Sequence, residues 1–467
     1  MKRLLWRRAV VLALVAGTVA AVGATVSSGS NRETAAPSSY AFGGTFTLTG
    51  PAAFLGLFEE AAVRLAVEQF MKGDCIIFTV PRQPCRGGGL LIGGKKVPIR
   101  WKAYDDQSDA RKAIDNVTRL LEQDKARAIW GPRMNDAVVS SASILEPRKI
   151  INICSICSSP AMTIGRKYGF DITDTGVLEK HAIGQFINEP DRVLRRNGVN
   201  PSFLRGRKRT AFIGRNELYT VHGSYGWEEA MEKGGRKFQF DRKKDTILYP
   251  FGTTDFSSYV AKLAARKPQI VLMDAYVIPD MISIMKEMKK QGLNFENGKI
   301  VLLGNDVFAL QFFHDTAKKE GLKMSNQWNW GWQEHKPDVD KTTQARIDKY
   351  VRIYNKKFAK TNVGASSPFD QGTYDAAMWL LYGIEKAGTL TDNDKIAAAM
   401  KSLRLNGLRF PGEQMFRRPD NGEMTGQLYV KEHIMGFKND KVYYTGINYQ
   451  RSLFYGPWVY GDKLPKG

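Results

Sequence analysis

Four cysteines are the residues of this chain best suited to covalent chemistry. Cys154 and Cys157 have the Cys-x-x-Cys spacing of redox and metal motifs, but no second cysteine or histidine pair stands at ligand spacing. This spacing leaves three interpretations open: a thiol–disulfide protein, a structural disulfide, or two buried thiols. Cys75 and Cys85 bracket a proline-containing loop, and we expect them to form a disulfide in an oxidising compartment.

Two other patterns of reactive residues do not meet the requirements of their chemistry. Residues 89–96 nearly match a phosphate-binding loop, but Lys96 replaces the final Ser or Thr and a strand-like segment follows. The five histidines are widely spaced, and no Gly-x-Ser-x-Gly nucleophile elbow occurs. We therefore expect no enzyme, no metal ion and no cofactor, with the thiol–disulfide protein as the remaining enzymatic alternative.

A strand, a turn and a helix near the start of the chain predict an anion cradle. Residues 44–48 have the pattern of a strand, residues 49–56 form a turn with glycine and proline, and a helix then runs to Phe70. Backbone N–H groups at a helix N-terminus, aided by the helix dipole, hold anions such as a carboxylate. The segment favours the capture of small solutes.

The first 26 residues have the features of a removable export signal. Four basic residues precede the apolar run 9–24, which ends in small residues suited to signal peptidase. A transmembrane anchor is the alternative, although the run is shorter than the about 20 apolar residues of a membrane span. Residues 27–40 are polar and contain proline, which indicates a disordered leader. We therefore expect a periplasmic protein.

The composition is typical of a soluble basic protein. The formal net charge is +22, and removal of the signal leaves +18. These charges are scattered apart from a cluster at 205–209, and no RNA-binding or helix-turn-helix signature occurs. We expect no nucleic-acid partner. The about 440 remaining residues are enough for two or three domains.

Strands and helices alternate along the chain from residue 41. Strand-like segments at 97–104, 126–130 and 150–153 are separated by helical patterns, and a second such run begins at Thr210. This alternation predicts two lobes with parallel sheets built from right-handed βαβ units. Open parallel sheets bind ligands beyond the carboxyl ends of their strands, so two facing sheets would bind a ligand in the cleft between them.

Several short motifs occur in a shared order at the expected strand ends and helix starts. They are residues 48–52 (LTGPA), 104–108 (YDDQS), 129–132 (IWGP), 158–163 (SSPAMT), 224–226 (SYG) and 369–377 (FDQGTYDAA). With them, the chain resembles the type I periplasmic solute-binding proteins of the branched-chain amino acid (leucine/isoleucine/valine-binding) group over about residues 40–450.

The resemblance implies an α/β fold with two Rossmann-like lobes, joined by three crossover strands and closing as a hinged trap. Lobe 1 would comprise residues 41–176 and 331–411, and lobe 2 residues 177–330 and 412–467. The resemblance implies a substrate-binding protein of an ABC importer without catalytic activity. Such a protein captures a branched-chain amino acid or a related small amphoteric or anionic solute and delivers it to a membrane permease. A ligand-sensing partner of a membrane receptor is the alternative. We expect a monomer.

The resemblance also carries ligand-binding roles onto this sequence. Asn135 and Ser158 match positions that bind the ligand carboxylate. Ile156 matches a position whose backbone carbonyl accepts a hydrogen bond from the ligand ammonium. A plain helix N-cap for Asn135, and an ordinary strand-end loop for the other two, are the alternatives. Tyr225 and Tyr276 match aromatic residues that lobe 2 brings to the ligand, with core packing as the alternative.

Asp306 matches the acidic residue that pairs with the ligand ammonium, and a helix N-cap is the alternative. Arg133 lies where small or neutral residues are usual and could contact an anion, as for a dicarboxylate or an aromatic acid. Leu55 lies where an aromatic residue is common, so the side-chain pocket differs. Three tryptophans alternate at 328, 330 and 332 and would line the cleft or pack the hinge.

Overall fold

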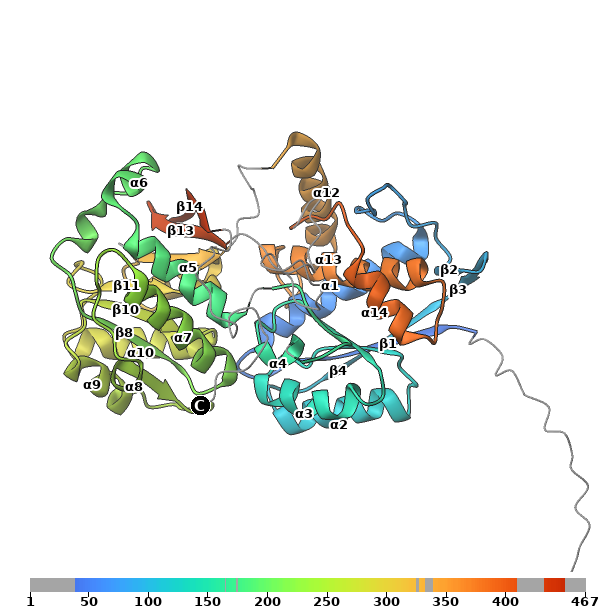
Figure 1. Cartoon of the computed structure of the whole chain (residues 1–467), viewed down its shortest axis with the longest axis horizontal. Helices are drawn as coiled ribbons and strands as arrows, with labels where there is room; N and C mark the ends of the chain where they lie inside the picture. Colours follow the sequence, from blue (N-terminus) through green and yellow to red (C-terminus); the bar gives the residue numbers. More distant parts are fainter. Residues whose placement is uncertain are drawn as a thin grey trace, which may run out of the picture. The chain divides into compact units, whose positions relative to one another are not determined.

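The computed structural model describes residues 38–163, 165–173, 175–324, 327–331, 339–409 and 432–449, which fall within one compact unit beginning at Ser38 (Figure 1). The expected signal peptide, most of the expected leader, Trp332 and much of the expected second segment of lobe 2 lie outside these residues. None of the helices in the described ranges has both the length and the apolar character of a membrane span.

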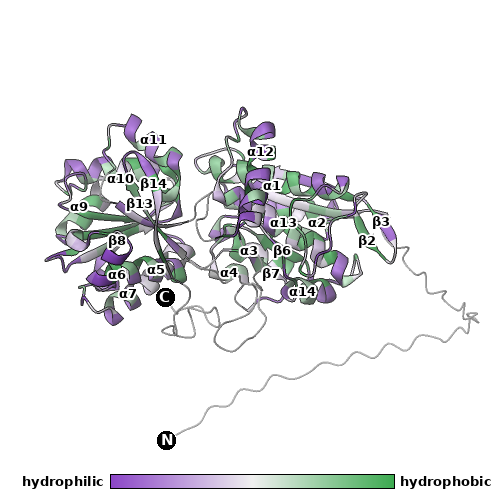
Figure 2. Cartoon of the chain, turned by 90° about the horizontal axis from the view of Figure 1, so that it is seen from above, coloured by the Kyte–Doolittle hydropathy of each residue, from purple (hydrophilic) through white to green (hydrophobic). Residues whose placement is uncertain are grey.

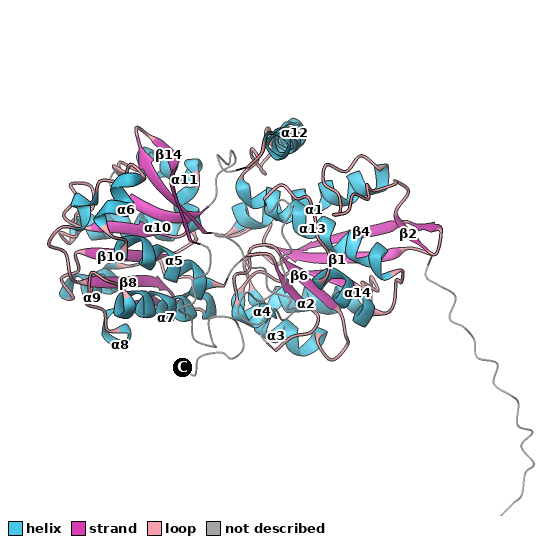
Figure 3. Ribbon diagram, turned by 45° about the horizontal axis from the view of Figure 1, so that its top comes forward, coloured by secondary structure: helices cyan, strands magenta, loops and turns pink. Residues whose placement is uncertain are grey.

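The first sheet is built from the early part of the chain and is parallel throughout. Its strands lie in the order β4–β1–β5–β6–β7, and helices cover both of its faces (Figure 3). We call this sheet and its helices lobe 1. Its elements are β1 (Tyr40–Phe46), α1 (Ala53–Lys72), β4 (Ile99–Asp105), α2 (Ala110–Glu122), β5 (Ala128–Trp130), α3 (Asn135–Leu145), β6 (Ile151–Cys154), α4 (Pro160–Thr163), β7 (Gly169–Asp171), α12 (Lys341–Phe358), α13 (Pro368–Ala387) and α14 (Asn393–Lys401).

The second sheet has the order β14–β13–β12–β11–β10–β8–β9. We call this sheet and its helices lobe 2. Its elements are α5 (Gly176–Asn188), α6 (Asp191–Arg196), η1 (Pro201–Leu204), β8 (Thr210–Arg215), α7 (Leu218–Lys233), α8 (Arg242–Asp245), β9 (Thr246–Tyr249), α9 (Ser257–Ala265), β10 (Ile270–Asp274), α10 (Ile278–Lys290), β11 (Val301–Gly304), η2 (Asp306–Ala309), α11 (Gln311–Lys319), β12 (Gln327–Gly331), β13 (Glu432–Lys438) and β14 (Lys441–Tyr449).

The second sheet is not parallel throughout. Strands β9, β8, β10, β11 and β12 are parallel, whereas β13 pairs antiparallel with both β12 and β14. The turn between β13 and β14 has positive φ at both Asn439 (52°) and Asp440 (58°), and a two-residue turn of this kind joins antiparallel strands. The predicted parallel sheet of lobe 2 is therefore extended by an antiparallel hairpin at this edge.

The predicted α/β class with two Rossmann-like lobes is confirmed, while the residue limits of the lobes stay predictions. Strands β1, β8 and β10 are buried along their whole length, as expected for strands covered by helices on both faces. In Figure 2 the helices show both hydrophobic (green) and hydrophilic (purple) segments, as one-sided packing requires.

Two details of the first lobe differ from the expected elements or add to them. Strand β1 begins at Tyr40 rather than Gly44, because it pairs with β4 from Tyr40 onward. The rejected phosphate-loop pattern forms a β-hairpin of β2 (Leu90–Ile92) and β3 (Lys95–Val97). The predicted disulfide between Cys75 and Cys85 is present before this hairpin.

Candidate ligand-binding site

A small cavity, partly open to solvent, lies beyond the carboxyl ends of strands from both sheets. Residues that follow β5 and β6 form its lobe 1 wall, and residues that follow β8, β10 and β11 form its lobe 2 wall. Seven of the eight predicted ligand-binding residues line it, namely Leu55, Arg133, Asn135, Ile156, Ser158, Tyr276 and Asp306.

Tyr225 is the predicted residue that does not line the cavity. It is half-buried on α7 with the guanidinium of Arg242 3.7 Å from its ring centroid. Tyr219 on the same helix lines the cavity instead. Six residues at about 3.6 per turn put the two side chains about 120° apart around the helix, so both cannot face one cavity.

The first βα turn is not an open anion cradle, contrary to expectation. The carboxylate of Asp105 accepts hydrogen bonds from the backbone N–H of Leu48 (2.9 Å) and Thr49 (3.2 Å) and from the Thr49 hydroxyl (2.7 Å). The N–H of Ala52 faces the Ser108 hydroxyl at 3.4 Å. A carboxylate of the protein therefore already occupies this turn.

The donors of Ser158 are also bonded to acidic side chains. Its hydroxyl donates to Glu179 of α5 at 2.8 Å, and this hydroxyl has a single proton to give. Burial raises the pKa of Asp171 to about 7, although hydrogen bonds from Thr173 and from the backbone of Ser158 oppose that shift. Ser158 lines the cavity, but no donor of Ser158 is left for a ligand carboxylate in this arrangement.

Asn135 makes a hydrogen bond from lobe 1 to lobe 2. Its side-chain amide donates to Glu217 at 3.2 Å, and Tyr276 donates to the same carboxylate oxygen at 3.0 Å. Arg215 pairs with Glu217 at 3.0 Å. Burial raises the pKa of Glu217, and the charge of Arg215 and the bond from Asn135 oppose this. Helix α3 begins at Asn135 with Met134 as its N-cap, so the plain N-cap interpretation of Asn135 is wrong.

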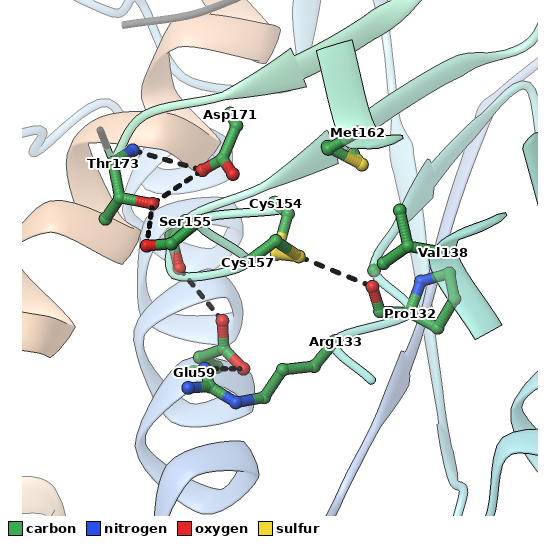
Figure 4. The surroundings of a disulfide bond; sticks show 12 residues. Glu59, Pro132, Arg133, Val138, Cys154, Ser155, Cys157, Met162, Asp171 and Thr173 are labelled. Carbon is green, nitrogen blue, oxygen red and sulfur yellow. Dashed lines mark hydrogen bonds and ion pairs between the residues drawn. A yellow bond between two sulfur atoms is a disulfide. The ribbon is translucent and has the colours of Figure 1, made fainter. Parts of the chain in front are cut away.

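Arg133 faces the cavity from lobe 1 and has one close acidic neighbour. Its guanidinium lies 3.5 Å from Glu59 of α1, which also accepts a hydrogen bond from Ser155 at 3.0 Å (Figure 4). Its charge centre is 5.9 Å from the ring centroid of Tyr276. Arg133 is therefore positioned to meet an anion, with its charge balanced by Glu59.

Behind the lobe 2 wall, a fully buried lysine is surrounded by acidic residues. The ammonium of Lys180 lies 3.0 Å from Glu179 and 3.1 Å from Asp274, and 3.4 Å from the ring centroid of Tyr219. Burial raises the pKa of Glu179 to about 8, Lys180 opposes the shift and the nearby Asp306 adds to it. A single lysine thus faces three neighbouring carboxylates.

Asp306 lines the cavity at the end of β11. Among the described residues, none donates a hydrogen bond to its carboxylate or forms a close ion pair with it, while the charges of Lys180, Arg133 and Arg409 act on it at longer range. Burial raises the pKa of Asp306 to about 6, although the charges of these three cations lower it. Asn305, not Asp306, caps η2 by accepting from the N–H of Val307. The N-cap interpretation of Asp306 is therefore wrong.

Cys154 and Cys157 form a disulfide at the edge of the cavity. Cys157 lines the cavity beside Ile156, and its sulfur lies 3.4 Å from the carbonyl oxygen of Pro132 (Figure 4). The two cysteines are 0% and 4% exposed. Thiol–disulfide exchange needs an accessible sulfur, so this burial favours the structural interpretation.

Trp328 packs inside lobe 2 and does not line the cavity. Its ring centroid lies 5.3 Å from that of Phe186 and 5.2 Å from that of Phe203. The side chain of Trp330 and all of Trp332 lie outside the described residues. Within the described part of the chain, no group of three or more His, Cys, Asp or Glu side chains is arranged to hold a metal ion.

Several residues of the site were not predicted. Tyr219, Val307 and Phe369 line the cavity. Glu179 and Glu217 accept hydrogen bonds from Ser158 and Asn135, respectively. The signal for Glu217 and Tyr219 was their place directly after a buried strand, where parallel sheets bind ligands. Glu179 follows no strand directly, so that rule does not indicate it.

Solved structures with this fold include several solute-binding proteins. A leucine-binding protein (LivK) from Thermotoga maritima is 16% identical, covers 87% of this chain and 97% of its own, and has a TM-score of 0.64. The LivJ protein of Streptococcus pneumoniae in complex with isoleucine is 18% identical, with coverages of 88% and 98% and a TM-score of 0.61.

A third structure binds a different class of compound. A solute-binding protein of an ABC transporter from Rhodopseudomonas palustris in complex with 3,4-dihydroxybenzoic acid is 17% identical, with coverages of 89% and 97% and a TM-score of 0.63. At such identities these likenesses establish the fold. A search of curated proteins found no match.

The family model described as "Periplasmic binding protein" matches residues 39–434, which include the whole cavity wall and both sheets except β14 and most of β13. The chain therefore belongs to the periplasmic binding protein family.

Proposed function

We propose that this protein is the extracytoplasmic substrate-binding component of an ABC importer, and that it captures a small solute in the cavity by closure of its two lobes. One observation carries the proposal: the cavity is walled by strand-end residues of both lobes and presents an acidic and a basic side chain, Asp306 and Arg133. A site with both charges suits an amphoteric solute, of which a branched-chain amino acid is one example.

Closure of the lobes is supported by contacts that join lobe 1 to lobe 2. Asn135 of lobe 1 donates to Glu217 of lobe 2, and Phe54 of α1 meets Phe312 of α11 with ring centroids 5.5 Å apart. Phe312 is 42% exposed, so this aromatic contact lies at the surface. Contacts of this size can form and separate without unfolding either lobe.

An extracytoplasmic location is supported by the chemistry of the cysteines. All four are paired in two disulfides, which persist in oxidising compartments such as the periplasm. The expected export signal agrees with this location. The bound solute would pass to a membrane permease, and the related fold of other transport proteins supports that partner.

A thermal-shift screen of the purified protein tests the proposal. Amino acids, amines, aromatic acids and amides are added singly. A solute that binds the native state raises the melting temperature, and this rise grows with the logarithm of the solute concentration divided by its Kd. Small-angle scattering then compares the protein with and without the best solute. Binding with a more compact shape is the expected result, and a complete lack of binding across the screen would contradict the proposal.

A further inference from the structure

Asn135 and Ser158, the lobe 1 residues predicted to bind a ligand carboxylate, each donate a hydrogen bond to a carboxylate of the protein. Glu217 accepts from Asn135, and Glu179 accepts from Ser158. Both glutamates come from lobe 2, across the cavity from the donors. A ligand carboxylate would have to displace them and would add negative charge beside them.

Helix α3 strengthens this conclusion. It begins at Asn135, which lines the cavity, and the dipole of a helix favours an anion at its N-terminus. However, its first turn carries Asp136, whose charge also raises the pKa of Glu217. Two carboxylates of the protein therefore already lie near this helix end.

The lobe 2 wall has the opposite property, because its acidic groups outnumber its cation. Lys180 pairs with Glu179 and Asp274, whereas Asp306 lines the cavity and has no cation bonded to it within the described ranges. A buried carboxylate without a partner costs free energy that an incoming cation would recover. The ring of Tyr219, which also lines the cavity, offers a further surface for a cation.

Among the described residues that line the cavity, Arg133 is the basic one and could attract an anion. Glu59 lies 3.5 Å from its guanidinium and balances its charge, and both side chains are largely buried. Arg133 and Glu59 together are close to neutral, so they give a ligand carboxylate less attraction than an isolated arginine would. The charge balance of the cavity therefore favours a cation.

We propose that the cavity selects a small organic ammonium compound through Asp306, and that Glu179 and Glu217 make an α-carboxylate on the ligand unnecessary. This inference rests on the proposed function and narrows its solute class. Purely anionic solutes are excluded, and amines or amino acid amides bind at least as well as the corresponding amino acids. Glu179 and Glu217 act as specificity-determining residues because they accept hydrogen bonds from Ser158 and Asn135 that a ligand carboxylate would otherwise accept.

Two matched series of probes test the proposal by isothermal titration calorimetry on the full mature chain. The aliphatic series is L-leucine, L-leucinamide, 3-methylbutylamine and 4-methylpentanoate. The aromatic series is L-phenylalanine, L-phenylalaninamide, 2-phenylethylamine and 3-phenylpropionate. Within each series the apolar group stays the same while the carboxylate, the ammonium or both are present.

The expected result is that, in at least one series, the amine and the amide bind as tightly as the amino acid or more tightly, and the acid does not bind. An amino acid that binds at least ten-fold more tightly than its amide and amine would overturn the proposal, as would binding of an acid alone. Absence of binding by all eight probes also overturns it. The proposed function fails only if the whole solute screen is negative, so the two failures are distinguishable.

Two variants of Glu179 separate its charge from its hydrogen bond. Glu179→Gln keeps an acceptor for Ser158, whereas Glu179→Ala frees the hydroxyl for a ligand. We expect the ratio of amino acid affinity to amine affinity to rise about ten-fold in Glu179→Ala and less in Glu179→Gln, since a charge-assisted hydrogen bond becomes available to the ligand. An unchanged ratio in a folded Glu179→Ala protein would contradict the role of Glu179. The wild-type series keeps the proposal testable if that variant does not fold.

Discussion

On the lobe 1 wall of the cavity, Asn135 and Ser158 each donate a hydrogen bond to a glutamate, whereas on the lobe 2 wall no cation of the described part of the chain is bonded to Asp306. The two walls follow equivalent strand ends of two similar sheets, so the difference does not come from the fold. It comes from which charged side chains lie behind each wall. A residue at an equivalent place in the fold can thus bind a ligand only if neighbouring side chains leave its hydrogen-bond donors or acceptors available.

The largest effect should come from the cation of the lobe 2 wall. Lys180→Met keeps most of the side chain's apolar volume but leaves Glu179 and Asp274 without their cation. We expect the free energy of unfolding to fall by about 3–5 kcal/mol, because breaking a fully buried ion pair leaves uncompensated charge. Urea denaturation at neutral pH measures this change.

An exposed lysine of the same lobe provides the control for this variant. Lys286 pairs with Glu320, and both side chains are about half exposed. Lys286→Met should change stability little, since solvent screens such pairs. Equal stability losses in the two variants would contradict the view that buried charge dominates the lobe 2 wall.

The second prediction concerns the unpaired carboxylate. Asp306→Asn keeps the size of the side chain and removes its charge. We expect the affinity for the best amine probe to fall by about 100-fold, because the ammonium loses its partner in a buried site. Titration calorimetry measures the loss. The control Asp315→Asn alters an exposed residue of α11 and should leave affinity unchanged, and a loss of less than three-fold in Asp306→Asn would refute ammonium pairing.

Acidic pH should weaken amine binding to a smaller extent. Burial raises the pKa of Asp306 to about 6 in the unliganded protein, so its carboxylate is mostly ionised at pH 7 and mostly protonated at pH 5. An ammonium binds the ionised form, so affinity should be present above pH 6 and fall by about ten-fold between pH 7 and pH 5. Calorimetry at the two pH values measures this, and the same loss in Asp306→Asn would assign it to another group.

The cavity wall was predictable from the sequence because its residues follow strands and share the order of family motifs. Arg133, Ile156 and Asp306 were placed correctly in this way. The bonding of Asn135 and Ser158 was not predictable, because Glu217 lies 82 residues from the first and Glu179 lies 21 residues from the second. Such contacts depend on packing between lobes, which no local pattern reports.

Tyr225 and the first βα turn illustrate two further limits. A motif placed Tyr225 on the helix that borders the cavity. The rotation of each residue around the helix axis decides which side chain faces the cavity, and that side chain is Tyr219. The turn was predicted as open because its N–H groups are unpaired within the helix. Asp105, from a different strand, accepts from the N–H groups of Leu48 and Thr49 at the start of the turn, and the sequence of the turn alone does not indicate this contact.

The smallest effect should come from the two disulfides, which differ in their distance from the lobe 1 wall. Cys154 and Cys157 close a short loop that contains Ile156 and ends beside Ser158, so the cross-link limits the motion of residues that line the cavity. Replacing both by alanine would leave this loop to be ordered on binding. We expect a loss of about 1 kcal/mol, or about five-fold in affinity for the best probe.

The second disulfide provides the matched comparison. Cys75 and Cys85 lie outside the cavity wall, so their double alanine variant should lose stability without losing affinity, because a disulfide restricts the unfolded chain wherever it lies. Thermal denaturation and calorimetry on both variants separate the two quantities. Equal affinities in the two variants would mean that packing of Ile156 and Ser158 holds the loop without its cross-link. Weakened binding in both would mean that stability of lobe 1, and not the local loop, limits the site.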